Sequence, residues 1–165
     1  MGRLPNQWEG SQVPDTKVGF ITKRTDGPVW DMAPGRPAVF KLLCDQTGGS
    51  IAVLEEVVPT GMGTPLHIHH TSDEVIHIFS GSFIVRLGEE MREANEGDWI
   101  FIPRGVLHGW RTLTDGRAFF IFTPGDGGKT VEEMRFLMKY GLDISPAERE
   151  GIWKRHGTEY VTRDW

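Results

Sequence analysis

The chain has 165 residues but only one cysteine, Cys44, so it has no internal disulfide and nothing in it indicates an oxidising compartment. Its longest apolar runs, at residues 99–102 and 118–122, fall far short of the roughly 20 residues that a membrane-spanning helix requires. Residues 1–8 contain no apolar stretch of signal-peptide length. These absences predict a cytoplasmic protein with no membrane partner.

Basic residues are in the minority. Lysine and arginine together number 18, against 23 for aspartate and glutamate, which gives a formal net charge of -5. A nucleic-acid-binding protein needs a clustered basic surface, so this balance argues against that class of partner. The chain is nevertheless long enough to bury a core without disulfides or structural metals, as one domain of ordinary size.

Glycine and proline are abundant. The 21 glycines and 10 prolines form nearly a fifth of the chain, against roughly an eighth in average proteins. They separate short apolar runs rich in β-branched and aromatic residues, a pattern typical of strands joined by tight turns. The runs that we interpret as strands are residues 38–44, 51–58, 67–69, 74–79, 83–87, 98–102, 107–112 and 117–122. The sequence therefore predicts an all-β sandwich or barrel.

The two ends of the chain have a different character. Residues 1–36 are polar and rich in turn formers, with one strand expected at 18–22, and we interpret them as an arm before a barrel at 37–128. The tail at 129–165 predicts two helices, at 130–140 and 146–156. The residues that indicate them are Val131, Met134, Leu137 and Met138 at helical spacing in the first, and Ser145 as N-cap, Pro146, Glu148 and the terminating Gly157 in the second.

Histidine is concentrated in one short segment. His67 and His69 are two residues apart, a spacing that points both imidazoles to the same face of a strand. Glu74 follows at an odd offset from His69, so the chain must bend between them, and residues 71–73 have suitable turn chemistry. Two imidazoles on one face, a nearby carboxylate and a further imidazole from elsewhere suit a transition metal. A later histidine, His108, follows a Pro-x-Gly turn.

These residues form a recognisable pattern. The segment from Gly61 through His67, His69 and Glu74 to Gly81 resembles the first signature of the cupin superfamily at every fixed position, and a second signature follows fifteen residues later. The fixed positions of that second signature are Gly97, Pro103, Gly105 and His108, with Thr112 in place of its final Asn. Residues 47–49 with Glu55, residues 122–125 and the tail at 140–142 are also similar to small cupins of the quercetin-dioxygenase-like kind.

The resemblance implies a double-stranded β-helix, or jelly-roll barrel, with one divalent metal ion in its mouth. His67, His69, Glu74 and His108 would be the ligands by position. The donor set suits Fe, Mn, Ni, Co, Cu or Zn without selecting among them, and four protein ligands leave one or two positions open for substrate. The Thr112 departure does not touch a ligand and affects only a local hydrogen bond. His70 and His77 are expected to point away from the metal.

The strand pattern also predicts an apolar interior beside the metal. Counting alternate residues from the ligands gives a small-molecule pocket lined by Ile76, Ile78, Phe101, Trp110 and Phe122. The alternative is that a barrel of this size is filled by its own side chains.

The leading functional hypothesis is a dioxygenase-type oxidoreductase that acts on an aromatic or enolisable small organic molecule. The metal would lower the pKa of a bound substrate hydroxyl, and Glu74 would act as ligand and catalytic base. The alternatives are a non-oxidative isomerase, cyclase or lyase, and a cupin that binds a small molecule without turnover. The resemblance also implies a homodimer. The arm, with Trp8, Phe20 and Trp30, would either pair with a partner's edge strand or cap its own barrel.

Overall fold

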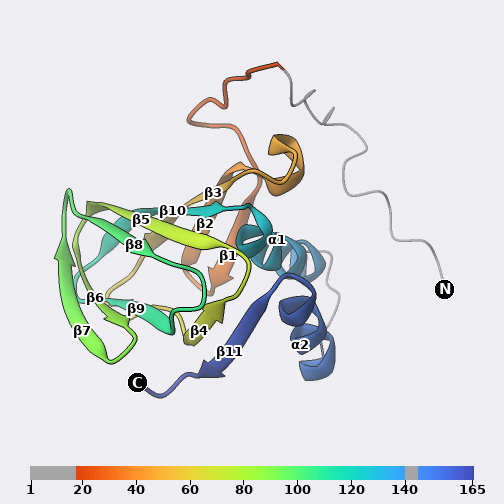
Figure 1. Cartoon of the computed structure of the whole chain (residues 1–165). Coiled ribbons are helices and arrows are strands. Elements are labelled where there is room, and N and C mark those ends of the chain that lie inside the picture. The colour runs from red at the N-terminus through yellow and green to blue at the C-terminus, as the bar shows by residue number, and fades with distance from the viewer. Residues whose placement is uncertain (1–17, 140–144) are drawn as a thin grey trace.

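The computed structural model describes residues 18–139 and 145–165, and it contains two antiparallel sheets that face each other (Figure 1). The six-stranded sheet has the order β1 (Val29–Ala33), β2 (Arg36–Leu42), β3 (Ala52–Val58), β10 (Gly116–Thr123), β5 (Asp73–Ser80) and β8 (Trp99–Ile102). The five-stranded sheet has the order β11 (Thr158–Thr162), β4 (Leu66–His69), β9 (His108–Thr112), β6 (Ser82–Leu87) and β7 (Glu90–Asn95). Strands distant in sequence alternate between the sheets, and this arrangement is the predicted jelly-roll barrel.

The predicted strands of the barrel are present, but the sequence pattern missed three others and misplaced one. β1 and β7 were missed because the apolar/polar alternation is weak in each, and β11 because it was assigned to the helical tail. The segment 18–22 was expected to be a strand, which is wrong: those residues have no regular structure. The first strand instead lies at β1, where Trp30 is buried in this chain's own core.

The core lies between the inner faces of the two sheets. Trp110 of β9 is its centre: its ring stacks on Phe120 at 4.9 Å and approaches Phe83 at 5.6 Å. Ile76 and Ile78 of β5 are fully buried against the same cluster. Burying each such side chain contributes about 1.5–3 kcal/mol, so these aromatic and aliphatic contacts supply much of the barrel's stability.

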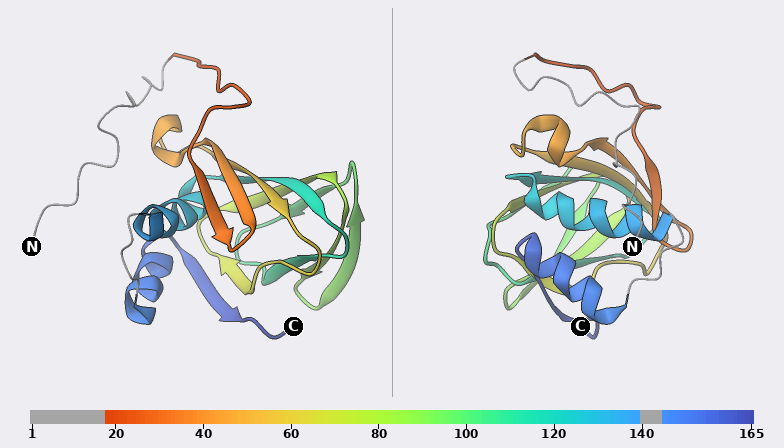
Figure 2. Two further views of the ribbon diagram at one scale, coloured as in Figure 1. Left: turned by 180° about the vertical axis from the view of Figure 1, so that it is seen from behind. Right: turned by 90° about the vertical axis from the view of Figure 1, so that its right-hand side faces the viewer.

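Two helices lie across one end of the barrel, as the right-hand view of Figure 2 shows. They are α1 (Asp126–Lys139) and α2 (Pro146–Arg155), and a short 3₁₀ turn, η1 (Cys44–Thr47), packs beside α1. α1 begins against the barrel wall, and a Cβ on Gly128 would lie 2.4 Å from that of Ala52. Only glycine allows this close approach of helix and sheet.

The start of α2 follows the sequence prediction. Ser145 caps the helix and forms the expected capping box with Glu148. Gly157, with a φ of 65°, ends the helix and turns the chain into β11. None of the helices in the described part of the chain is long and apolar enough to cross a membrane.

Candidate metal centre

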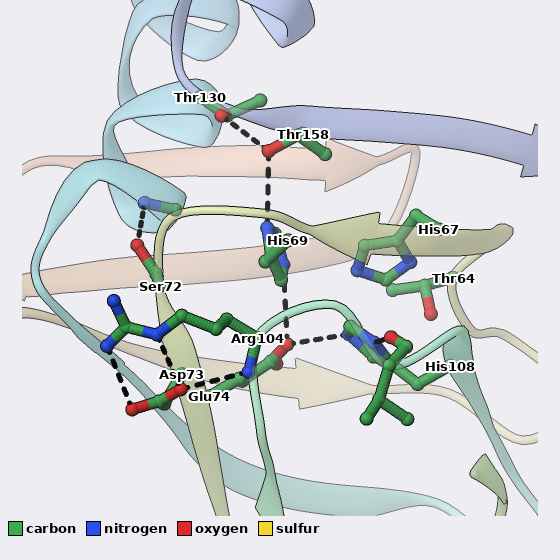
Figure 3. Close-up of polar contacts among 12 residues, drawn as sticks. Thr64, His67, His69, Ser72, Asp73, Glu74, Arg104, His108, Thr130 and Thr158 are labelled. Carbon is green, nitrogen blue, oxygen red and sulfur yellow. Dashed lines mark hydrogen bonds and ion pairs between the residues drawn. The ribbon is translucent and has the colours of Figure 1, made fainter. Parts of the chain in front are cut away.

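Four side chains converge at the end of the barrel beneath α1 (Figure 3). They come from three strands: His67 and His69 from β4, Glu74 from β5 and His108 from β9. One potential ligand atom from each lies within 4.8 Å of all the others. Three of these residues are buried and His67 is intermediate in exposure. The sequence-predicted set is therefore brought together in space.

The predicted bend between His69 and Glu74 is present. β4 ends at His69, residues 70 and 71 form a bend, and β5 starts at Asp73 in the other sheet. The Ser72 hydroxyl accepts a hydrogen bond from the Gly127 backbone N–H at the start of α1, at 2.8 Å. Arg104 donates to both Asp73 carboxylate oxygens. These contacts fix the corner that carries Glu74 to the facing sheet.

The three imidazoles present the same nitrogen to the cluster. His67 and His108 each donate from Nδ1 to the backbone carbonyl two residues earlier, of Pro65 at 2.8 Å and of Val106 at 2.9 Å. His69 instead has its Nδ1 at 3.2 Å from the Thr158 hydroxyl of β11. Since each Nδ1 is occupied, every Nε2 is directed toward the centre. Metal-bound histidines are held in this way by a partner on the other ring nitrogen.

Glu74 is held in its ionised form. Burial opposes its charge, but the hydrogen bond from His108 and the nearby His69 imidazole outweigh burial and keep the pKa of Glu74 well below its usual range. Glu74 Oε2 lies 3.0 Å from His108 Nε2 and 3.4 Å from His69 Nε2. Burial likewise disfavours the His108 imidazolium, yet the contact with Glu74 wins and raises the pKa of His108. A metal would displace that proton.

The donor set fits a divalent transition metal. Burial, aided by the nearby His108 and His69, lowers the pKa of His67 well below its usual value, so this ring is neutral as a metal ligand must be. The Nε2 atom of His69 is buried and has no hydrogen-bond partner among the described residues. A buried polar atom without a partner is costly, and an ion at the centre of the four groups would satisfy it.

The predicted pocket residues fall into two groups. Ile76, Ile78, Trp110 and Phe122 are buried and face the barrel interior. The prediction for Phe101 is wrong: its side chain is 60% exposed on the outer face of the six-stranded sheet. The β8 sequence Trp-Ile-Phe-Ile is apolar on both faces, so alternation could not set its register. Pairing with β5 directs Ile100 and Ile102 inward instead.

The interior beside these residues is closely packed. Trp110 is only 2% exposed and contacts aromatic rings on two sides. Two cavities of about 420 Å³ lie elsewhere, one on the outer face of the six-stranded sheet and one between α2 and β11.

The other predicted histidines point away from the cluster. His70 is exposed and pairs with Glu159, and His77 stacks on Trp99 outside the barrel. Thr112, which replaces the usual Asn, donates to the Pro59 carbonyl at 2.6 Å and so still makes a local hydrogen bond.

Two threonines that hold His69 from outside the cluster were not predicted from the sequence. Thr130 of α1 lies 2.9 Å from the Thr158 hydroxyl, and Thr158 contacts His69. No local signal pointed to these threonines, because the contact spans 89 residues and depends on the unpredicted strand β11.

Comparison with known proteins agrees with this geometry. The model of the cupin domain family matches residues 53–124, the part of the chain that carries all four cluster residues. Residues 53–124 are therefore a cupin domain. The chain is 39% identical over 57 residues to the uncharacterized protein MJ1618 of Methanocaldococcus jannaschii, an alignment that covers 34% of the chain and 46% of the relative. The chain spans about half the length of the curated relatives it matches.

Solved structures share the fold at low identity. KdgF from Halomonas sp. is 21% identical, with a TM-score of 0.58 over 65% of this chain and 94% of that one. Pac13, a nucleoside dehydratase, is 15% identical, with a TM-score of 0.54 over 66% of this chain and 84% of the other. These likenesses establish the barrel architecture.

Proposed function

We propose that this cupin is a metal-dependent enzyme of the dioxygenase type, which acts on an aromatic or enolisable small organic molecule. The observation that carries the proposal is a buried cluster of one carboxylate and three imidazoles that can bind a metal in their neutral form. A divalent transition metal bound there would act as a Lewis acid and keep one or two positions open for an oxygen atom of the substrate and for O₂.

The chain's own residues supply a rigid, partly shielded setting. His67, His69 and His108 are each fixed through Nδ1, so their geometry is set before any ligand arrives. Preorganised groups of this kind need no rearrangement during reaction. The buried Phe122 ring lies 5.3 Å from the His69 ring and keeps water from that side of the cluster.

Glu74 is the residue that we propose as the base. Its carboxylate is ionised, so it is free of a proton when a substrate hydroxyl arrives. Moving one oxygen away from the metal would let it accept that proton.

The test is O₂ uptake by protein reconstituted separately with Fe, Mn, Ni, Co, Cu or Zn, using flavonols and catechols as substrates. We expect uptake with at least one redox-active metal and none with Zn. Glu74→Gln should abolish it, while Met91→Gln, an exposed position on β7, should not. Substrate turnover under argon would instead support an isomerase, cyclase or lyase. The absence of both would contradict an enzymatic role.

A further inference from the structure

The C-terminal strand reaches into the cluster through a single side chain. β11 pairs with β4 so that Thr158 lies directly opposite His69. Both residues are buried, and Thr158 Oγ1 lies 3.2 Å from His69 Nδ1. On its other side the same hydroxyl lies 2.9 Å from Thr130 Oγ1 of α1. A chain of two hydroxyls therefore links the helical tail to one imidazole, as Figure 3 shows.

The protonation of His69 follows from its contacts. Its Nδ1 lies 3.2 Å from the Thr158 hydroxyl, whereas its Nε2 lies 3.4 Å from Glu74 Oε2 without the geometry of a hydrogen bond. When the ring proton is on Nδ1, the Thr158 oxygen is its acceptor. Thr158 then has its own hydroxyl proton left for Thr130. This assignment satisfies each group and leaves the Nε2 lone pair directed at the centre of the cluster.

We propose that Thr158, held by Thr130, is a positioning residue that fixes the tautomer and ring orientation of His69 for metal binding. The inference rests on the proposed metal site. The tail is consequently part of the site: the Ser145 cap sets the start of α2, Gly157 turns the chain, and β11 then delivers Thr158. Loss of such a partner typically weakens metal affinity 10- to 100-fold.

The experiment compares Thr158→Val, which keeps the shape but loses the hydroxyl, with Thr158→Ser, which keeps the hydroxyl. The full chain is titrated with Co²⁺ against a competing chelator. We expect Thr158→Val to raise the Kd about 10- to 100-fold and Thr158→Ser to restore it to within about threefold. Thr130→Val should have a smaller effect, because it acts through Thr158.

A second readout does not depend on the metal. Long-range ¹H–¹⁵N spectra of the metal-free protein report which nitrogen of His69 carries the proton. We expect Nδ1 in the wild type and in Thr158→Ser, and a mixture in Thr158→Val. Wild-type affinity with an unchanged tautomer in Thr158→Val would overturn the proposal, as would equal losses in both Thr158 variants. Failure of the wild type to bind Co²⁺ would contradict the metal site itself, while the spectra would still test the positioning role.

Discussion

Two buried glutamates on the inner face of the six-stranded sheet have opposite electrostatic settings. Glu56 and Glu74 lie four positions apart along the paired strands, toward opposite ends of the barrel. Glu56 accepts a 2.6 Å hydrogen bond from Arg36 Nε, and the Arg36 guanidinium also lies over the Trp110 ring at 4.7 Å. Glu74 faces three imidazoles and, among residues 18–139 and 145–165, no lysine or arginine.

The difference separates a structural role from a functional one. At the Arg36 end the protein provides a permanent cation, so the charge of Glu56 is balanced at every pH of interest. At the other end, within the described part of the chain, the positive charge facing Glu74 is a proton shared with histidines, which a metal can replace. A third buried carboxylate, Glu132 of α1, accepts a hydrogen bond from the Cys44 backbone N–H but has no ion pair of its own among the described residues.

The largest effect is expected at the Arg36 end. Arg36→Met removes the guanidinium from a buried pair and should lower the free energy of unfolding by about 3–5 kcal/mol. Urea denaturation of the metal-free protein measures this change. Added metal should stabilise the variant only as much as it stabilises the wild type. A loss below about 1 kcal/mol would show that the two ends of the barrel are not distinguished in this way.

Glu74→Gln should have the opposite effect, with a large loss of metal affinity and little change in the stability of the metal-free protein. We expect it to weaken Co²⁺ binding at least 100-fold, because a buried anionic ligand is lost. The metal-free variant should nevertheless unfold within about 1 kcal/mol of the wild type, since glutamine still accepts a hydrogen bond. Thermal unfolding with and without metal measures both quantities. Wild-type stabilisation by Co²⁺ in this variant would count against Glu74 as a ligand.

Glu132 adds to the comparison, because this side chain should make the free energy of unfolding depend on pH. Burial raises the pKa of Glu132 from an ordinary value of 4.5 to about 7 in the folded protein. The folded state therefore binds the proton more tightly, so stability from this group is present below about pH 4.5 and is lost as pH rises toward 7. Glu132→Gln should be about 3 kcal/mol more stable than the wild type at pH 8, with no gain at pH 4.5. An equal gain at both pH values would point to packing instead.

Metal affinity should also fall with acidity. Because the contact with Glu74 raises the pKa of His108, metal binding must release a proton from that ring in mildly acidic solution. We expect the Kd for Co²⁺ to rise about tenfold for each pH unit below 6, and metal to be lost near pH 5. Retention of one equivalent of metal after dialysis at pH 5 would contradict this expectation.

The smallest effect is expected where a ligand is held by the backbone. His108 donates to the Val106 carbonyl, which Val106→Ala retains. We expect this variant to bind Co²⁺ within about threefold of the wild type, because the partner on the imidazole is unchanged. A loss as large as that of Thr158→Val would show that packing, not hydrogen bonding, orients the histidines.

The sequence was sufficient for the parts of the site that depend on local spacing. His67 and His69 share a strand, the odd offset to Glu74 demands a bend, and His108 follows a fixed turn, so all four cluster residues were predicted. The jelly-roll fold followed from the same motifs together with the regular spacing of turns.

The missed features depend on long-range pairing. β8 is apolar on both faces, so its sequence does not show which of its residues face inward. Phe101 was therefore predicted on the wrong face. β11 is five residues long and follows a helix, so nothing local distinguished it from the helical tail. β11 forms a strand by pairing with β4, and this pairing places Thr158 opposite His69.

The central claim is that His67, His69, Glu74 and His108 bind one ion together. X-ray absorption of the protein loaded with one equivalent of Zn²⁺ tests it most directly. The predicted result is three imidazole nitrogens at roughly 2.0–2.1 Å and at least one oxygen at a similar distance, with the oxygen contribution reduced in Glu74→Gln. Two or fewer imidazoles, or a spectrum unchanged by that substitution, would contradict the account.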